Sequence, residues 1–232
     1  MFRGAGRRYK VGRDFILIVL GVILTAGFST CLAAEASHRA GNWQGFMSAN
    51  YLNSETIDFG GGSKAEIDGD MGWIFGFGYN FNEKLALDME LGWNSVSYTG
   101  TRVQPPSTTE QFSGWLDTTS TRFNLTYNFM AKTFTPFVSA NIGWVWVDTN
   151  IPVGPPAGGC WWDPWLGYCV PYQPTYAKTE FAYGAALGVR FDLKDNLFLR
   201  GIIGEQWADV SKADSTPSFT QYRFDFGMLF GK

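Results

Sequence analysis

The chain has 232 residues, with 18 basic and 21 acidic side chains, a single histidine and three cysteines. No basic patch or basic helix stands out, so the composition argues against a nucleic-acid partner. After the first 36 residues no run of roughly eighteen apolar residues occurs, which excludes a transmembrane helix from that part of the sequence.

The N-terminal 36 residues have the organisation of a cleavable signal peptide. A basic start is followed by the apolar run 15–26 and by small residues up to Ala36. A membrane-anchoring helix would need about twenty apolar residues, and Gly27, Ser29 and Thr30 dilute this run too early for that. We therefore predict a signal peptide over residues 1–36, cut near Ala34 or Ala36, and one domain over residues 37–232.

Two weaker interpretations of this segment are a twin-arginine signal at Arg7 and Arg8 and a lipid attached to Cys31. The apolar core of the segment favours general export, and Thr30 does not match the small residue that usually precedes a lipidated cysteine.

Removal of residues 1–36 leaves 13 basic and 19 acidic residues, a net charge of −6.

Most of the remaining sequence alternates with a period of two, which predicts β-strands. In residues 72–81 the aromatic side chains from Trp73 to Phe81 fall on one face, and Gly72, Gly76 and Gly78 fall on the other. A soluble sandwich would turn the apolar face inward and would place bulky polar residues outside. Small residues on the second face favour the inverse arrangement, a barrel with lipid outside and a narrow lumen inside.

The same alternation recurs in seven other stretches, so that the prediction is eight strands in all. They cover residues 43–51, 85–94, 122–129, 138–146, 180–192, 197–207 and 221–230. Short connections (82–84, 131–135, 193–196) alternate with longer ones (52–66, 97–113, 148–178, 208–217). An even strand number and alternating connection lengths are typical of an all-β, eight-stranded antiparallel up-and-down transmembrane barrel. The alternative, a soluble barrel such as a lipocalin, would bury its aromatic face.

Several segments carry a family resemblance. They are residues 72–87, 135–137, 184–191 and 222–227. On these residues the chain resembles the small outer-membrane β-barrel superfamily that includes the OmpA transmembrane domain, OmpX and OmpW. The resemblance implies a Gram-negative outer membrane, with outer-membrane lipid, lipopolysaccharide and the barrel assembly machinery as partners. Such proteins usually end on an aromatic residue, whereas here Gly231 and Lys232 follow Phe230.

Charged residues recur at positions that should face the lumen. They are Asp88, Glu90, Arg122, Glu180, Arg190, Arg200, Arg223 and Asp225. Side chains fill the interior of an eight-stranded barrel, and a lone buried charge is costly. We therefore expect these acids and bases to pair as a polar plug, with Glu90 and Arg122 in one network. The alternative is a narrow gated pore.

The third long connection holds the cysteines that remain after cleavage, Cys160 and Cys169. An even pair in an exported protein predicts a disulfide; a structural zinc would normally need four ligands, and we expect no metal or cofactor. The aromatic residues of this loop are Trp161, Trp162, Trp165 and Tyr168. Rigid aromatic side chains suit a contact surface for an unknown host or surface ligand, or else they cap the barrel or dip into the lipid interface.

Catalysis is the least favoured function. Barrel enzymes such as lipid A palmitoyltransferases and outer-membrane phospholipases use a histidine near neutral pH, and the only one here, His38, precedes the first strand. A carboxylate pair such as Asp163 with Glu180 has nothing that marks it as special. The leading prediction is a non-enzymatic surface barrel that supports envelope integrity and makes contacts through its loops. The alternative is a small, porin-like conduit for ions or apolar solutes, as the resemblance to OmpW suggests.

Overall fold

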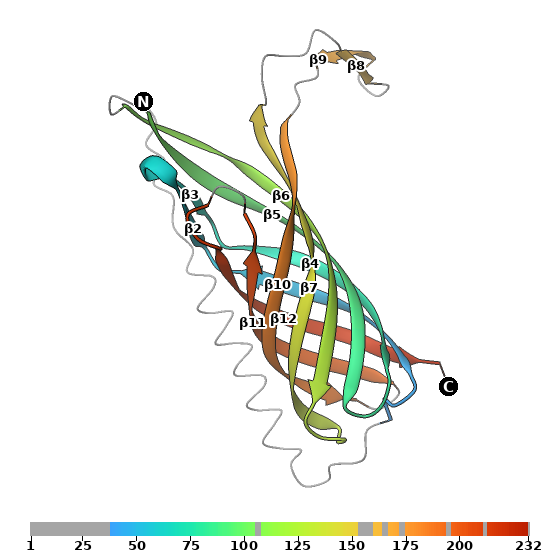
Figure 1. Cartoon of the computed structure of the whole chain (residues 1–232). Helices are drawn as coiled ribbons and strands as arrows, with labels where there is room; N and C mark the ends of the chain where they lie inside the picture. Colours follow the sequence, from blue (N-terminus) through green and yellow to red (C-terminus); the bar gives the residue numbers. More distant parts are fainter. Residues whose placement is uncertain are drawn as a thin grey trace, which may run out of the picture.

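A computed structural model describes residues 38–104, 108–152, 160–163, 167–171, 175–193, 196–210 and 213–231 (Figure 1). The signal peptide predicted for residues 1–36 lies outside these ranges and stays a prediction. Eight long strands form a closed antiparallel barrel, in which the last strand pairs with the first. These strands are β1 (Trp43–Leu52), β4 (Asp70–Asn80), β5 (Leu85–Gln104), β6 (Thr108–Asn128), β7 (Phe134–Pro152), β10 (Thr175–Asp192), β11 (Leu197–Ala208) and β12 (Ser218–Phe230). Among the described residues, no helix is long and apolar enough to cross a membrane.

The two ends of the barrel differ. At one end, which we call the turn end, lie the start of β1, the end of β12 and the connections β4–β5, β6–β7 and β10–β11. At the opposite end, the loop end, the strands β5, β6, β7 and β10 continue well beyond the others (Figure 1). The barrel therefore has the asymmetry that the connection lengths predicted.

The alternation in the sequence corresponds to the two faces of the wall. Phe77, Trp144 and Phe226 point outward with half of their surface exposed, at 50%, 50% and 51%. Near the turn end the rings of Trp43 and Phe77 stack with centroids 5.0 Å apart. A closed barrel in water would not expose aromatic residues on every side, because they leave a large apolar surface uncovered. The outer face is therefore the lipid-facing one.

The second long connection differs from its prediction. Residues 97–113 were expected to form a loop, but β5 and β6 pair continuously from Leu85 opposite Tyr127 to Gln104 opposite Thr108. Only Pro105, Pro106 and Ser107 come between these two strands in the sequence. Val96 and Tyr98 are buried on its inner side, so β-branched and aromatic residues keep the strand pattern past the membrane band.

A further hairpin completes the wall at the loop end. It consists of β2 (Glu55–Phe59), the short 3₁₀ turn η1 (Gly60–Gly62) and β3 (Ser63–Ile67). β3 pairs with the outer half of β5, with Ile67 opposite Tyr98. On its other side, Phe59 of β2 forms a bridge with Ala213 of the β11–β12 connection. The hairpin thus extends the barrel wall above β4 and β1.

A small separate ribbon stands beyond β7 and β10, formed by β8 (Cys160–Asp163) and β9 (Tyr168–Pro171). In this ribbon Cys169 is opposite Trp162, and Cys160 is opposite Pro171. The two cysteines are thus on paired strands, two positions out of register. The disulfide between them stays a prediction.

Candidate functional site

The interior of the barrel has two levels, and the lower one, toward the turn end, is filled with charge. Glu90 on β5 contacts Arg223 on β12 at 2.6 Å, and Arg223 contacts Asp225 at 2.6 Å. Asp225 contacts Arg200 on β11 at 2.8 Å, and Arg200 contacts Asp88 on β5 at 3.3 Å. All five side chains are buried. Acids and bases alternate along this chain of contacts, so each buried charge has an opposite neighbour, as burial requires.

Aromatic rings fill the space between these groups. The guanidinium of Arg200 lies 4.1 Å from the ring centroid of Phe46, and that of Arg190 lies 4.0 Å from that of Phe198. The two rings meet edge to face, with centroids 6.5 Å apart. Phe46 fits because Gly76 opposite it has no side chain: a Cβ there would overlap the ring. The glycines of residues 72–81 thus line a crowded interior.

The turn end of the charged level is closed by Arg190 and Arg39. Arg190 contacts Asp192 at 2.6 Å and donates a hydrogen bond of 2.8 Å to Gln44, which in turn donates to Asp88. Arg39, just before β1, contacts Asp192 at 3.5 Å and donates to the carbonyl oxygens of the β6–β7 turn. Burial lowers the pKa of Arg39, and the charge of Asp192 opposes this shift. We call the whole charged level the plug.

At its upper boundary the plug ends on Arg122 of β6. Arg122 Nη2 lies 3.3 Å from Glu90, the residue directly opposite on β5. Its Nη1 donates to the side-chain oxygens of Gln206 and Gln221, at 3.0 and 3.3 Å. These two amides come from β11 and β12, so Arg122 holds together three parts of the wall.

The structure joins seven of the eight residues that the sequence singled out for the lumen. They are Asp88, Glu90, Arg122, Arg190, Arg200, Arg223 and Asp225. Glu180 lies higher on β10, where it pairs with Lys178 at 2.7 Å. Sequence reasoning missed Gln44, Asp192, Gln206 and Gln221, which stand at inward positions of their strands and could have been found by the same alternation. It also missed Arg39, which precedes the first strand and shows no periodic signal.

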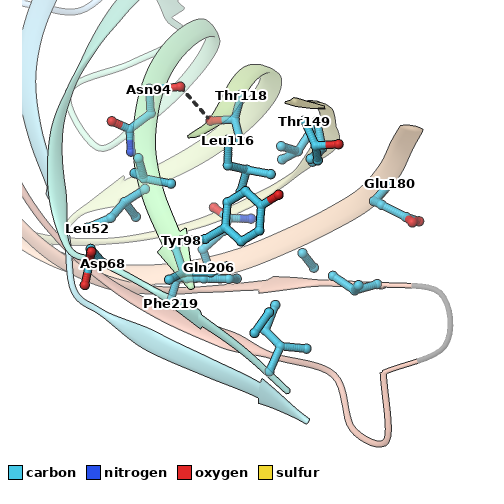
Figure 2. A pocket seen from close by; sticks show the side chains of 18 of the residues that line it. Leu52, Asp68, Asn94, Tyr98, Leu116, Thr118, Thr149, Glu180, Gln206 and Phe219 are labelled. Atoms are coloured by element: carbon cyan, nitrogen blue, oxygen red, sulfur yellow. Dashed lines mark hydrogen bonds between the residues drawn. The ribbon is translucent and has the colours of Figure 1, made fainter. Parts of the chain in front are cut away.

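Above the plug, toward the loop end, the interior opens into a cavity of about 900 Å³ (Figure 2). Its walls are mostly apolar. They include Leu52, Ile57, Phe59, Ile67, Ile74, Val96, Tyr98, Leu116, Val145, Val147, Val210 and Phe219. Arg122, Gln206 and Gln221 line it where it meets the plug. Along β5 the lining runs from Gly92 to Arg102, ten steps along the strand or roughly 33 Å.

The plug itself leaves little room. A second cavity, lined by Asp88, Glu90 and Arg223 among others, holds about 10 Å³, roughly the space of one water molecule. In this structure the charged residues therefore separate the large cavity from the turn end. A pore along the barrel axis would require the ion pairs to open.

The remaining predicted sites are placed only in part. Trp165 lies outside the described residues, and the side chains of Trp161, Trp162, Tyr168, Cys160 and Cys169 also lie outside the described part of the structure. Whether the aromatic residues form a contact surface, a cap or an interfacial belt stays a prediction. His38 is exposed ahead of β1 at the turn end, where its carbonyl oxygen accepts a hydrogen bond from Asn42. Within the described ranges, no three His, Cys, Asp or Glu side chains come together as a metal site.

A closed eight-stranded barrel with exposed aromatic residues outside and paired charges inside defines an integral β-barrel protein of an outer membrane. The family model of the outer membrane protein beta-barrel domain matches residues 20–230, and the chain belongs to this family. The protein therefore resides in the Gram-negative outer membrane. Barrels of this class have short periplasmic turns and longer outer loops, and on this basis we assign the turn end to the periplasm and the loop end to the outside.

Three solved structures are similar to this chain at low sequence identity. OprG from Pseudomonas aeruginosa has a TM-score of 0.50 at 13% identity, covering 84% of this chain and 99% of that one. Neisserial surface protein A has a TM-score of 0.47 at 12% identity, covering 80% and 97%. Ail from Yersinia pestis, in complex with the heparin analogue sucrose octasulfate, has a TM-score of 0.44 at 13% identity, covering 81% and 99%. Among curated proteins, no sequence matches this chain.

Proposed function

We propose that this protein is a non-enzymatic outer-membrane barrel that takes small apolar molecules from outside the cell into the upper half of its lumen. The single observation that carries the proposal is the cavity of about 900 Å³ with apolar walls above a closed plug. Binding sites for small molecules are typically apolar hollows of roughly 300–1,000 Å³ with a few polar groups. The sequence suggested two functions, surface contact through the loops and a conduit for ions or apolar solutes. A cavity of this kind favours the second, in the form of uptake of apolar solutes.

The plug argues against free passage of ions through the barrel. An ion crossing it would have to separate buried pairs such as Glu90–Arg223 and Arg200–Asp225. Opening such a pair leaves buried charges uncompensated, which is strongly unfavourable, whereas an apolar molecule can occupy the upper cavity without disturbing the pairs. The cavity wall also includes residues of the β2–β3 hairpin, such as Ile57 and Phe59. This hairpin therefore shapes the site as well as the rim.

What supports a non-enzymatic role is the position of the titratable groups. His38 is at the periplasmic end, away from the cavity, and the described residues that line the cavity include no histidine or cysteine. The acidic residues of the lining are Asp68 and Glu180, and Glu180 is already paired with Lys178.

Binding of 1-octanol to the barrel in lipid nanodiscs tests the proposal. Val145→Trp on β7 points into the cavity and should weaken octanol binding about tenfold or more, because the indole occupies the space that the ligand needs. Ala140→Trp on the same strand points toward lipid and is the matched control, which should bind octanol like the parent protein. Equal binding by the parent, V145W and A140W would place the alcohol in the surrounding lipid and would contradict the proposal.

A further inference from the structure

The base of the cavity differs chemically from its walls. Arg122, Gln206 and Gln221 line the cavity at the level where the plug begins. All three are buried, with 7% of the Arg122 side chain exposed. A ligand that fills the apolar space therefore meets a cation and two amides at its inner end.

Two hydrogen-bond donors at the base of the cavity have no acceptor among the described residues. Arg122 Nη1 donates to the oxygens of Gln206 and Gln221, so both amide oxygens are already used. In the described part of the chain, the Nε of Arg122 and the Nε2 of Gln206 have no hydrogen-bond partner. Other buried atoms without partners, such as Arg190 Nη2 and Arg200 Nη2, lie within the plug. Arg122 and Gln206, in contrast, line the cavity at its base, where a ligand can bring an acceptor.

Of the three arginines Arg122, Arg200 and Arg223, Arg122 contacts the fewest carboxylates. Arg223 contacts Glu90 and Asp225, and Arg200 contacts Asp225 and Asp88. Arg122 has the single carboxylate of Glu90, at 3.3 Å, and Glu90 makes its shorter contact, at 2.6 Å, with Arg223. A second carboxylate at Arg122 would give it the coordination that the other two already have.

We propose that the cavity binds a monocarboxylic acid with an apolar chain, oriented with its carboxylate toward Arg122 and Gln206. This inference rests on the proposed function and names the ligand class. On binding, the side chains of Arg122 and Gln206 turn toward the ligand, so that its carboxylate accepts hydrogen bonds from Arg122 Nε and Gln206 Nε2, the two donors without a partner among the described residues. Charge-assisted bonds of this kind are stronger than neutral ones, while the apolar chain contacts Ile74, Val96 and Val145 along the wall.

The opposite orientation would place the carboxylate among the cations of the outer rim. Lys64, Lys178 and Arg102 line the cavity there, but Lys64 and Lys178 pair with Glu66 and Glu180, and all three are partly or fully exposed to water. Exposed pairs contribute little to binding because water screens them. The buried base is therefore the stronger site for a carboxylate.

Octanoate and 1-octanol are the matched probes, because they share a chain and differ in the head group. We expect octanoate to bind the barrel in nanodiscs roughly tenfold more tightly than octanol at neutral pH, the effect of one charged hydrogen bond. In ¹⁵N–¹H spectra the Nε–H signal of Arg122 should shift on addition of octanoate and stay in place with octanol. Octanol binding as tight as octanoate binding, with an unmoved Arg122 signal, would overturn the inference and leave the proposed function standing. If neither probe binds, both fall.

Two variants locate the carboxylate. Arg122→Gln should abolish the preference for octanoate while keeping octanol binding, since Glu90 retains its contact with Arg223. Arg200→Gln is the matched control: it removes another arginine from the same plug, but Arg200 does not line the cavity, and the preference should persist. Loss of the preference in Lys178→Gln and its survival in R122Q would show that the head group lies at the rim. The comparison of the two probes on the parent protein remains decisive if a variant fails to fold.

Discussion

Arg223 on β12 and Glu90 on β5 form an ion pair of 2.6 Å across the barrel interior, between strands that are not neighbours in the sheet. Arg122, directly opposite Glu90 on the adjacent strand β6, is farther from it, at 3.3 Å. The nearer partner of Glu90 is thus Arg223, which lies on a strand that does not pair with β5. This contact ties the two sides of the lumen together.

We expect Glu90 and Arg223 to be strongly coupled in a double-mutant cycle. Glu90→Gln or Arg223→Gln alone leaves a buried charge with fewer partners and should lower the free energy of unfolding by roughly 3–5 kcal/mol. The double variant should lose less than the sum of the two, with a coupling of at least about 1 kcal/mol. Urea unfolding of the refolded barrel in micelles measures this.

The cycle of Glu90 with Arg122 is the internal comparison. Glu90 and Arg122 also contact each other, so their coupling should be present but smaller than that of Glu90 with Arg223. Additive losses in both cycles would mean that the plug contributes no pairwise stability.

A charge on the lipid face should prevent stable insertion. Phe77→Arg places a guanidinium where a half-exposed ring now faces lipid, and arginine at the midplane of a barrel costs roughly 2–4 kcal/mol. The unboiled variant should lose its altered mobility on gels and its resistance to protease. Thr109→Arg, exposed near the tip of the β5–β6 hairpin, is the control and should behave as the parent. Identical mobility shifts and protease resistance for F77R and the parent would refute the facing assigned to β4.

The tight contact between Gly76 and Phe46 predicts sensitivity to a single methyl group. Gly76→Ala puts a Cβ into the Phe46 ring, on which Arg200 also packs at 4.1 Å. The forced shift should lower the free energy of unfolding by roughly 1–3 kcal/mol. Gly45→Ala is the matched control, because its added Cβ would lie 3.4 Å from the nearest atom, on Phe230. Equal unfolding midpoints for the two variants in urea would argue against a crowded interior at Gly76.

We predict that Cys160 and Cys169 are bonded in protein taken from outer membranes. The bond encloses a short loop, so it should contribute about 2–3 kcal/mol to the order of that loop. Replacement of both cysteines by serine should leave the gel mobility shift intact, because the barrel closes through its own backbone pairs. Mass spectrometry of the unreduced protein checks the bond, and two free thiols would disprove it.

The double serine variant also separates the interpretations of the aromatic loop. Without the disulfide the loop is free to move. If the Trp residues form a binding surface, attachment to a surface or ligand should weaken, because binding must then restrict the motion of the loop. If they only cap the barrel, attachment should stay unchanged and conductance in planar bilayers should rise. The parent protein is the reference in both measurements.

The alternation in residues 72–81 was enough to assign which side of the wall meets lipid. Period-two facing is a local property, because successive side chains of any strand point to opposite sides. The same property identified Glu90, Arg200 and Asp225 as lumen residues and would have identified Gln206 and Gln221 as well. It placed Glu180 on the inner face, but it carried no information on the level of Glu180 along the axis.

Levels and partners across the lumen were decided only by the tertiary structure. Whether Arg223 meets Glu90 depends on strand tilt and on the stagger between neighbouring strands, which are properties of the closed barrel as a whole. The continuation of β5 and β6 to Gln104 and Thr108 likewise depends on their pairing with each other and with β3. The apolar cavity exists because these extended strands and the β2–β3 hairpin carry the wall beyond Arg122, where the plug ends. No single segment of the sequence contains that relationship.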